Sequence, residues 1–160
     1  MSPQQELEAC LRLLVALVLG TAIGIEREYH RHPAGLRTMA AVSVGSCLFA
    51  VVGTLVPHTD PTRIAAQVVT GVGFLGAGAI LRSGRSIHGL TTAAAIWVVA
   101  AIGMAAGFGL FIISTICALM VVVFLVALKR VEVVLFDSKG DEHAFHHLRE
   151  DDDDEEDNEP

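Results

Sequence analysis

The sequence predicts an all-α bundle of transmembrane helices, and two observations lead to this fold class. Apolar residues make up 52% of the chain and the mean hydropathy is +0.56, which is more apolar than a soluble domain of 160 residues needs. The apolar residues are also gathered into runs of about 20, long enough to cross a bilayer, with charged loops between them. One run, Leu90–Leu128, lacks charge entirely and is too long for a single span, so we place a break near Gly103–Gly109.

We therefore expect about five spans, at residues 7–25, 38–56, 62–81, 90–106 and 108–128. Residues 7–130 form the predicted transmembrane domain, and residues 131–160 form a short cytoplasmic segment with a disordered acidic tail. Lys and Arg are concentrated in the first and third loops and after the last span, which predicts an outside N-terminus and a cytoplasmic C-terminus. Val131–Phe136 suits either a short strand or a continuation of the last helix.

Capping residues locate the starts of two helices. Ser2 can cap the first helix, with Pro3 in its first turn and Gln5 at the position where a capping box needs Glu or Gln. Asp60 followed by Pro61 is a suitable cap and first residue for the third span.

The third span is uncharged from residue 65 to residue 81 and contains four glycines. Their spacing matches the dinucleotide-binding pattern, but the preceding strand and the later acidic residue that this pattern needs are missing. Small residues instead allow close approach of membrane helices. Gly71 and Gly78 fall on one helix face and the other two lie roughly opposite, so we expect two packing neighbours. The predicted packing glycines of the first and third spans are Gly20, Gly24, Gly71, Gly73, Gly76 and Gly78.

Polar side chains in the outer halves of the first and third spans form a first candidate site. Ionisable groups inside a membrane indicate a functional site by default, although a buried pair that only fixes helix register is the alternative. Asp60 could pair with Arg12 or with Arg63, and Arg12 could instead extend outward to the membrane surface. The members of this predicted polar cluster are Arg12, Asp60, Arg63 and Gln67.

Charged residues at the cytoplasmic ends of the spans form a second candidate site. The arginines alone are typical of membrane anchoring by positive loops. Glu26 and Glu28 add nothing to that signal and could form salt bridges that join the loops. The members of this predicted charged cluster are Glu26, Arg27, Glu28, Arg37, Arg82 and Arg85.

The sequence predicts neither catalysis nor a bound cofactor. It contains no nucleophile motif, catalytic triad or phosphate-binding loop, and its cysteines lack metal or redox spacing. Three histidines precede the acidic run at helical spacing and could bind divalent cations, or could simply belong to a solvated tail. They are His143, His146 and His147. The expected partners are membrane lipid and other membrane helices, from a second copy or from other proteins, and not nucleic acid or nucleotide.

Several short segments resemble, in the same order, the MgtC/SapB family of bacterial inner-membrane proteins. They are Arg12–Leu14, Gly20–Glu28, Ala34–Thr38, Arg63–Gly78 and Gly89–Trp97. The resemblance covers roughly Leu11–Leu128 and implies a multi-pass protein of the bacterial plasma membrane. It lies within the membrane part of the family, without the soluble C-terminal domain of virulence members.

This resemblance also implies a function. Some members of the family are linked to growth in low magnesium, to survival inside macrophages and to restraint of the proton-driven ATP synthase. The resemblance therefore implies a non-enzymatic regulator of magnesium or membrane-energy homeostasis, with importance at Glu26, Arg27, Arg37, Arg63 and Gln67. The alternative is a small transporter or channel subunit whose polar path is the predicted polar cluster.

Overall fold

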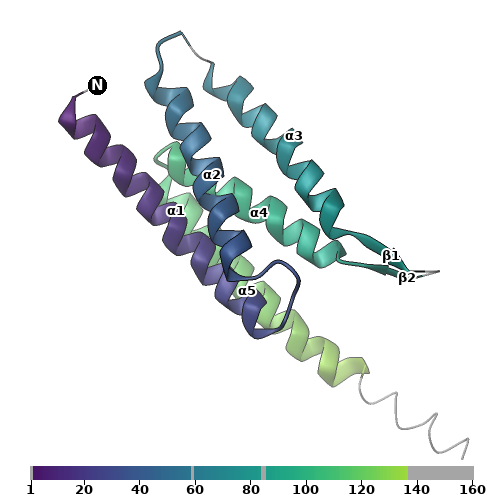
Figure 1. Ribbon diagram of the computed structural model, residues 1–160. Coiled ribbons are helices and arrows are strands. Elements are labelled where there is room, and N and C mark those ends of the chain that lie inside the picture. The colour runs from purple at the N-terminus through teal and green to yellow at the C-terminus, as the bar shows by residue number, and fades with distance from the viewer. Residues whose placement is uncertain (1, 59, 84–85, 137–160) are drawn as a thin grey trace, which may run out of the picture. The chain divides into compact units, whose positions relative to one another are not determined.

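The computed structural model describes residues 2–58, 60–83 and 86–136, which form helices and one short hairpin (Figure 1). In chain order the elements are α1 (Pro3–Tyr29), α2 (Leu36–Leu55), α3 (Pro61–Ala79), β1 (Leu81–Ser83), β2 (Ser86–His88), α4 (Leu90–Gly107) and α5 (Phe111–Phe136). The predicted all-α transmembrane bundle is confirmed, and the antiparallel β1–β2 hairpin is an addition to it. The chain divides into two compact units between Val122 and Val123, inside α5, and the domain boundary after residue 130 stays a prediction.

The predicted capping residues begin α1 and α3. The backbone N–H of Ser2 donates to Gln5 Oε1 at 2.9 Å, and the backbone N–H of Gln5 donates to Ser2 Oγ at 3.4 Å. These reciprocal bonds form a capping box, which satisfies donors that the first turn leaves unpaired. Asp60 caps α3 and Pro61 is its first helical residue, as the sequence predicts.

Helix α1 is longer than predicted. The charged stretch Glu26–Glu28, expected in a loop, continues the helix to Tyr29. Charged residues such as Glu and Arg are good helix formers, so a change of polarity alone does not end a helix. The helix ends just before Arg31, whose φ of 55° lies in the left-handed region, and Pro33 follows.

The last two helices are separated close to the predicted break. Helix α4 continues through Gly103 to Gly107, and α5 starts at Phe111 and not at residue 108. Gly109 lies in the turn between them with a φ of 81°, a conformation that glycine adopts without steric cost. Helix α5 extends to Phe136, so the segment that suited a strand or a helix is helical.

Helices α1, α2 and α4 lie side by side and pack against one another (Figure 1), and Ser43 of α2 is fully buried among them. Its hydroxyl donates to the backbone carbonyl of Ala16 at 2.7 Å, which ties α2 to α1. A Cβ placed on Gly20 of α1 would lie 2.5 Å from the Ser43 Cβ, and one placed on Gly103 of α4 would lie 2.8 Å from the Ser43 Cα. We call Ala16, Gly20, Ser43 and Gly103 the three-helix contact. The small size of these residues allows the three helices to approach this closely.

Small side chains also fill the space beside the three-helix contact. Cys47, Val51 and Ala106 are buried in one apolar cluster, with side chains from α1 packed against it. A Cβ placed on Gly24 would lie 2.7 Å from the Cα of Leu36, at the start of α2. The close helix approach predicted at the glycines of the first span is therefore present between α1 and α2.

Helix α3 is much less enclosed than the sequence predicts. Val72 and Gly76 are its buried residues, and a Cβ placed on Gly76 would lie 3.7 Å from the Ala93 Cβ of α4. Among the described residues, only one of the four predicted packing glycines of α3, Gly76, has a neighbouring helix within 4 Å of an added Cβ. At three of them an added Cβ would have no atom of the described residues within 4 Å, namely at Gly71, Gly73 and Gly78.

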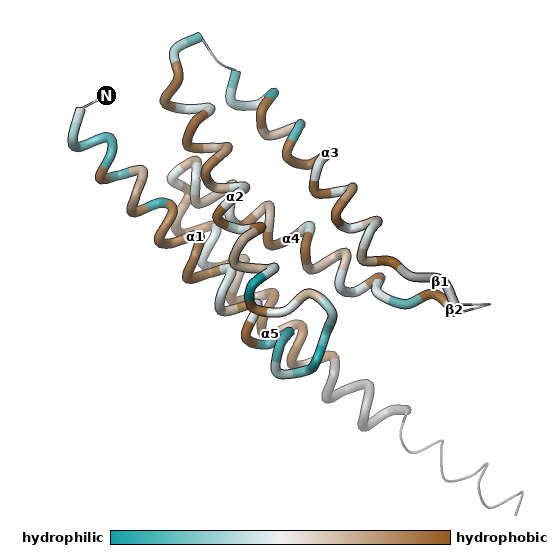
Figure 2. The backbone as a smooth tube through the Cα atoms, in the orientation of Figure 1, coloured by the Kyte–Doolittle hydropathy of each residue, from teal (hydrophilic) through white to brown (hydrophobic). Residues whose placement is uncertain are grey.

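Within the described residues, four helices have the length and composition to cross a membrane: α1, α2, α4 and the Phe111–Leu128 part of α5. Helix α3 is not among them, because Arg63, Gln67 and the glycines lower its hydropathy. Figure 2 shows this contrast, with hydrophobic residues along most of α2 and hydrophilic ones at the start of α3. The number of spans and their orientation stay predictions.

Candidate functional site

Two charged residues are buried at the C-terminal end of α1. The Arg27 side chain is only 1% exposed and Glu26 is 8% exposed. Arg27 Nη2 donates to Thr92 Oγ1 at 3.2 Å, and this bond joins the end of α1 to the first turn of α4. Burying a charge is costly unless it has partners, so the stability of this region depends on the contacts that these two residues make.

His30 is the close partner of Glu26. Its Nδ1 lies 2.9 Å from Glu26 Oε1 and 3.0 Å from the Glu26 backbone oxygen, and the first contact is an ion pair when the imidazole is protonated. Glu26 Oε2 and Arg27 Nε are buried without a hydrogen-bond partner among the described residues. We call Glu26, Arg27, His30 and Thr92 the buried charged site.

Sequence reasoning found only half of the buried charged site. Glu26 and Arg27 were predicted, but His30 and Thr92 were not. Glu26 and His30 have the i, i+4 spacing of side chains that meet on one helix face. This signal was not used, because the first helix was predicted to end before Glu26. No local pattern identifies Thr92, because it reaches Arg27 only through the packing of α4 on α1.

Of the other members of the predicted charged cluster, Glu28 and Arg37 have described side chains, and both are exposed. Glu28 is exposed, and its Oε2 accepts a hydrogen bond from the backbone N–H of Leu36 at 3.1 Å, at the start of α2. Arg37 is exposed on the first turn of α2. The Arg82 side chain and all of Arg85 lie outside the described residues.

Arg12 connects α1 to the far end of α4. Its Nη1 donates to the backbone carbonyl of Gly107 at 2.8 Å, and its Nη2 forms an ion pair with Glu8 Oε1 at 2.5 Å. Arg12 thus faces the bundle and pairs with a carboxylate, but with Glu8 and not Asp60. A cation beside the last carbonyl groups of a helix is stabilised by the helix dipole.

Asp60 acts as a helix cap and is exposed. Its Oδ1 accepts hydrogen bonds from the Thr62 hydroxyl at 2.7 Å and from the Thr62 backbone N–H at 2.9 Å. The side-chain bond and then the backbone bond hold the pKa of the Asp60 carboxyl below its ordinary value, and the charge of Arg63 adds a smaller contribution in the same direction.

Replacing Asp60 should therefore destabilise α3 in a pH-dependent way. Because the folded pKa is lowered, this contribution is fully present above about pH 4 and is lost as the pH falls through the folded pKa. We expect Asp60→Ala to lower the melting temperature of the purified chain by about 2–4 °C at pH 7. The difference from wild type should shrink near pH 3. Asp60→Asn, which can still cap, should melt close to wild type at pH 7 and serves as the control.

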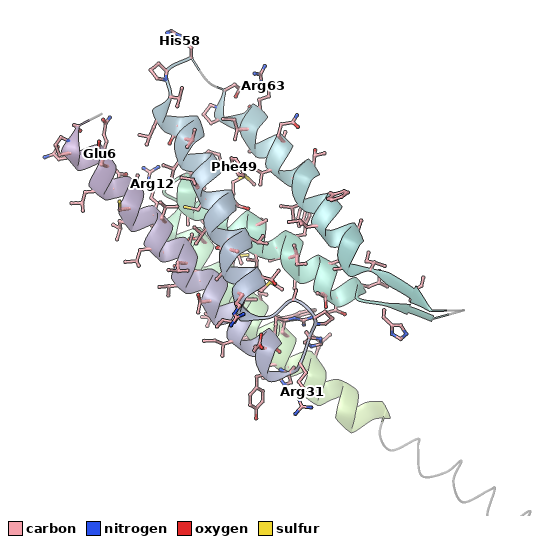
Figure 3. The ribbon with its side chains drawn as sticks, in the orientation of Figure 1. Glu6, Arg12, Arg31, Phe49, His58 and Arg63 are labelled. Carbon is pink, nitrogen blue, oxygen red and sulfur yellow. The ribbon has the colours of Figure 1, made fainter. Side chains whose placement is uncertain are left out.

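Arg63 and Gln67 line a groove between α2 and α3 with a volume of about 690 Å³. Figure 3 shows Arg63 on the first turn of α3, at the same end of the bundle as His58 in the α2–α3 turn. We call this cavity the α2–α3 groove. A second cavity of about 380 Å³ lies nearer the C-terminal end of α3 and shares Val42 and Leu75 with the groove.

The predicted polar cluster is therefore divided among three places. Arg12 bonds to α4 and Glu8, Asp60 caps α3, and only the remaining two residues line one cavity. The prediction placed them together because they share a depth in the membrane, but depth does not determine which helix faces which. In the described part of the chain, no group of three or more His, Cys, Asp or Glu side chains is placed to hold a metal ion.

Long apolar helices, a core of small residues and charges buried at a helix end define an integral membrane protein of the helical-bundle class. A model of the MgtC family matches residues 13–134. The chain belongs to the MgtC family, so the resemblance that the sequence motifs carry is confirmed.

Curated relatives agree with this assignment. The chain is 47% identical to an uncharacterized protein of Synechocystis sp. over 76% of this chain and 53% of the relative. It is 48% identical to protein MgtC of Salmonella typhimurium over 63% of this chain and 44% of the relative. It is 50% identical to an Escherichia coli protein named "Putative magnesium transporter YhiD", over 65% of this chain and 53% of the relative. The chain spans about half the length of these relatives, and no solved structure matches it.

Proposed function

We propose that this chain is a non-enzymatic regulator in the bacterial plasma membrane, acting through contacts between its helices and those of other membrane proteins. The surface of α3 is the observation that carries the proposal. Among its 19 residues only Val72 and Gly76 are buried. Gly73 has open space around it and does not line the α2–α3 groove, so another helix backbone could approach closely there.

The biological setting follows from the family. MgtC of Salmonella typhimurium and YhiD of Escherichia coli, whose name describes a magnesium transporter, are both similar to this chain over about half of their length. On this basis we propose a role in magnesium homeostasis, and the resemblance to the MgtC/SapB family adds membrane-energy homeostasis as the related setting. The remaining halves of those relatives lie outside the similarity, so the proposal concerns the membrane part that the chain shares with them.

Complementation with a partner-blocking variant tests the proposal. In a bacterium whose own gene for this chain has been deleted, growth in low magnesium should be restored by the wild-type chain and not by Gly73→Leu. Leu at this position should leave the fold intact, because no described atom lies within 4 Å of the added Cβ. Val18→Leu, a change on the exposed face of α1, is the control and should restore growth.

A photo-reactive residue at position 73 provides a second readout in native membranes. We expect it to cross-link to another protein, whereas the same residue at position 18 should not. Full growth with Gly73→Leu together with no protein cross-link from position 73 would falsify the proposal.

A small transporter or channel subunit is the second candidate. The presence of Arg63 and Gln67 in one groove favours it, because a path for ions needs polar side chains within the membrane. Ion flux into liposomes that contain the purified chain should then exceed background and fall with Gln67→Leu. Background flux in both preparations would dispose of this candidate and leave the regulator proposal untouched.

A further inference from the structure

The α2–α3 groove is an open space that the described residues leave unfilled. Nine of its twelve lining residues are apolar or glycine, and the polar ones are Ser46, Arg63 and Gln67. Gly45 of α2 and Gly71 of α3 both line it, and neither has a described atom within 4 Å of an added Cβ. The groove therefore owes its depth to the two glycines.

The dimensions of the groove match one lipid chain. On α3 its lining runs from Arg63 to Leu75, which is about 18 Å at 1.5 Å per residue. One leaflet contributes about 15 Å, half of the roughly 30 Å hydrocarbon core. A helix about 10 Å wide and 18 Å long fills about 1,400 Å³. That is twice the groove volume of about 690 Å³, so a partner helix could seat only part of its width there, whereas an acyl chain is narrow enough to lie within the groove.

The polar end of the groove suits an anionic headgroup. Arg63 and Gln67 lie one helical turn apart on α3, and Arg63 forms no ion pair within 4.0 Å among the described residues. A guanidinium can bind a phosphate through two parallel hydrogen bonds. The positive end of the α3 dipole acts in the same direction, partly offset by the Asp60 carboxylate, which is bonded to Thr62.

We propose that the α2–α3 groove binds an anionic phospholipid from the leaflet at the α2–α3 turn. One acyl chain lies along the groove past Gly45 and Gly71. Arg63 holds the phosphate, and the Gln67 amide donates to an oxygen of the headgroup or the glycerol ester. This lipid site is separate from the Gly73 face that the regulator proposal uses.

Lipid titration of the purified 160-residue chain tests the site. Native mass spectrometry from a zwitterionic detergent counts the lipids bound, using phosphatidylglycerol and phosphatidylcholine with identical acyl chains. We expect phosphatidylglycerol to bind about tenfold more tightly, because both headgroups present a phosphate to Arg63 but the choline cation of phosphatidylcholine repels the guanidinium. Arg63→Gln should reduce its affinity by about tenfold, to the level of phosphatidylcholine, and Arg63→Lys, which keeps the charge but not the two parallel hydrogen bonds, should fall between the two.

Two glycine variants separate the groove from the rest of α3. Gly71→Leu fills the groove and should reduce binding of both lipids. Gly73→Leu is the matched control, because it adds the same side chain at an equally open position that does not line the groove. It should bind both lipids like wild type, and circular dichroism verifies that all variants keep their helix content.

Three results would each overturn the proposal. In the first, folded Arg63→Gln and Gly71→Leu bind phosphatidylglycerol as wild type does. In the second, Gly71→Leu changes the oligomeric mass and not the number of bound lipids, which assigns the groove to a protein interface. In the third, glycerol phosphate without acyl chains displaces phosphatidylglycerol at equal concentration, which leaves an anion site without a lipid groove.

Discussion

Gly103→Ala should destabilise the bundle by about 2–3 kcal/mol, because it adds a methyl group at the three-helix contact. The added Cβ would lie 2.8 Å from the Ser43 Cα and closer still to the Ser43 carbonyl, which are backbone atoms of α2 that cannot rotate away. Relieving the clash requires α2 and α4 to move apart, which also loosens the contact with Gly20 of α1. Unfolding of the purified chain in mixed micelles, followed by far-ultraviolet circular dichroism as the fraction of SDS rises, measures the change.

Gly45→Ala is the matched control for this prediction. It makes the same chemical change in a helix of the same bundle, but the space around the added methyl group is open. We expect it to be neutral or to stabilise the chain by up to about 1 kcal/mol, because alanine restricts the unfolded backbone more than glycine does. Equal stabilities of the two variants would mean that α2 and α4 do not approach closely at Ser43.

Arg27→Met should cost about 3 kcal/mol or more. The substitution keeps most of the side-chain length but removes the hydrogen bond to Thr92 and leaves the buried Glu26 carboxylate without its neighbouring cation. Breaking a buried group of charges by removing one partner is strongly destabilising, since the remaining charge stays desolvated. The same SDS unfolding measurement, at neutral pH, provides the value.

Arg37→Met tests whether burial is the cause. Arg37 is exposed on α2, so the same substitution there should change the stability by less than about 0.5 kcal/mol. Adding Glu26→Gln to Arg27→Met should recover part of the loss, because the uncompensated carboxylate is then neutral. If the two methionine variants unfold alike, the buried charged site makes no net contribution to stability.

The sequence was sufficient to predict the helices and the family but not which helices touch. The apolar runs place α2, α3 and α4 to within a few residues, and capping chemistry locates the starts of α1 and α3. The end of α1 was predicted too early because the charged stretch Glu26–Glu28 was assigned to a loop. Glu and Arg have high helix propensity, and the burial of Glu26 and Arg27 also favours continuation of the helix.

The two candidate sites were only partly predictable for a related reason. Helical periodicity determines which residues share a face of one helix, but not which neighbour that face meets. Gly20 and Gly76 have helix neighbours whereas Gly73 faces open space, and nothing in their local sequence separates the three. Arg12 could have been paired with Glu8 from their i, i+4 spacing, but its bond to Gly107 depends on tertiary packing.

The way α3 is attached has a consequence for how the protein is made. Its buried residue Gly76 rests on Ala93 of α4, and Val72 lines a small cavity with Trp97 of the same helix. The ribosome completes α3 before α4 exists, so α3 leaves the translocation machinery with Arg63 and without its main support. We therefore expect its stable entry into the lipid phase to require synthesis of the following helix, so that α3 and α4 insert as one unit.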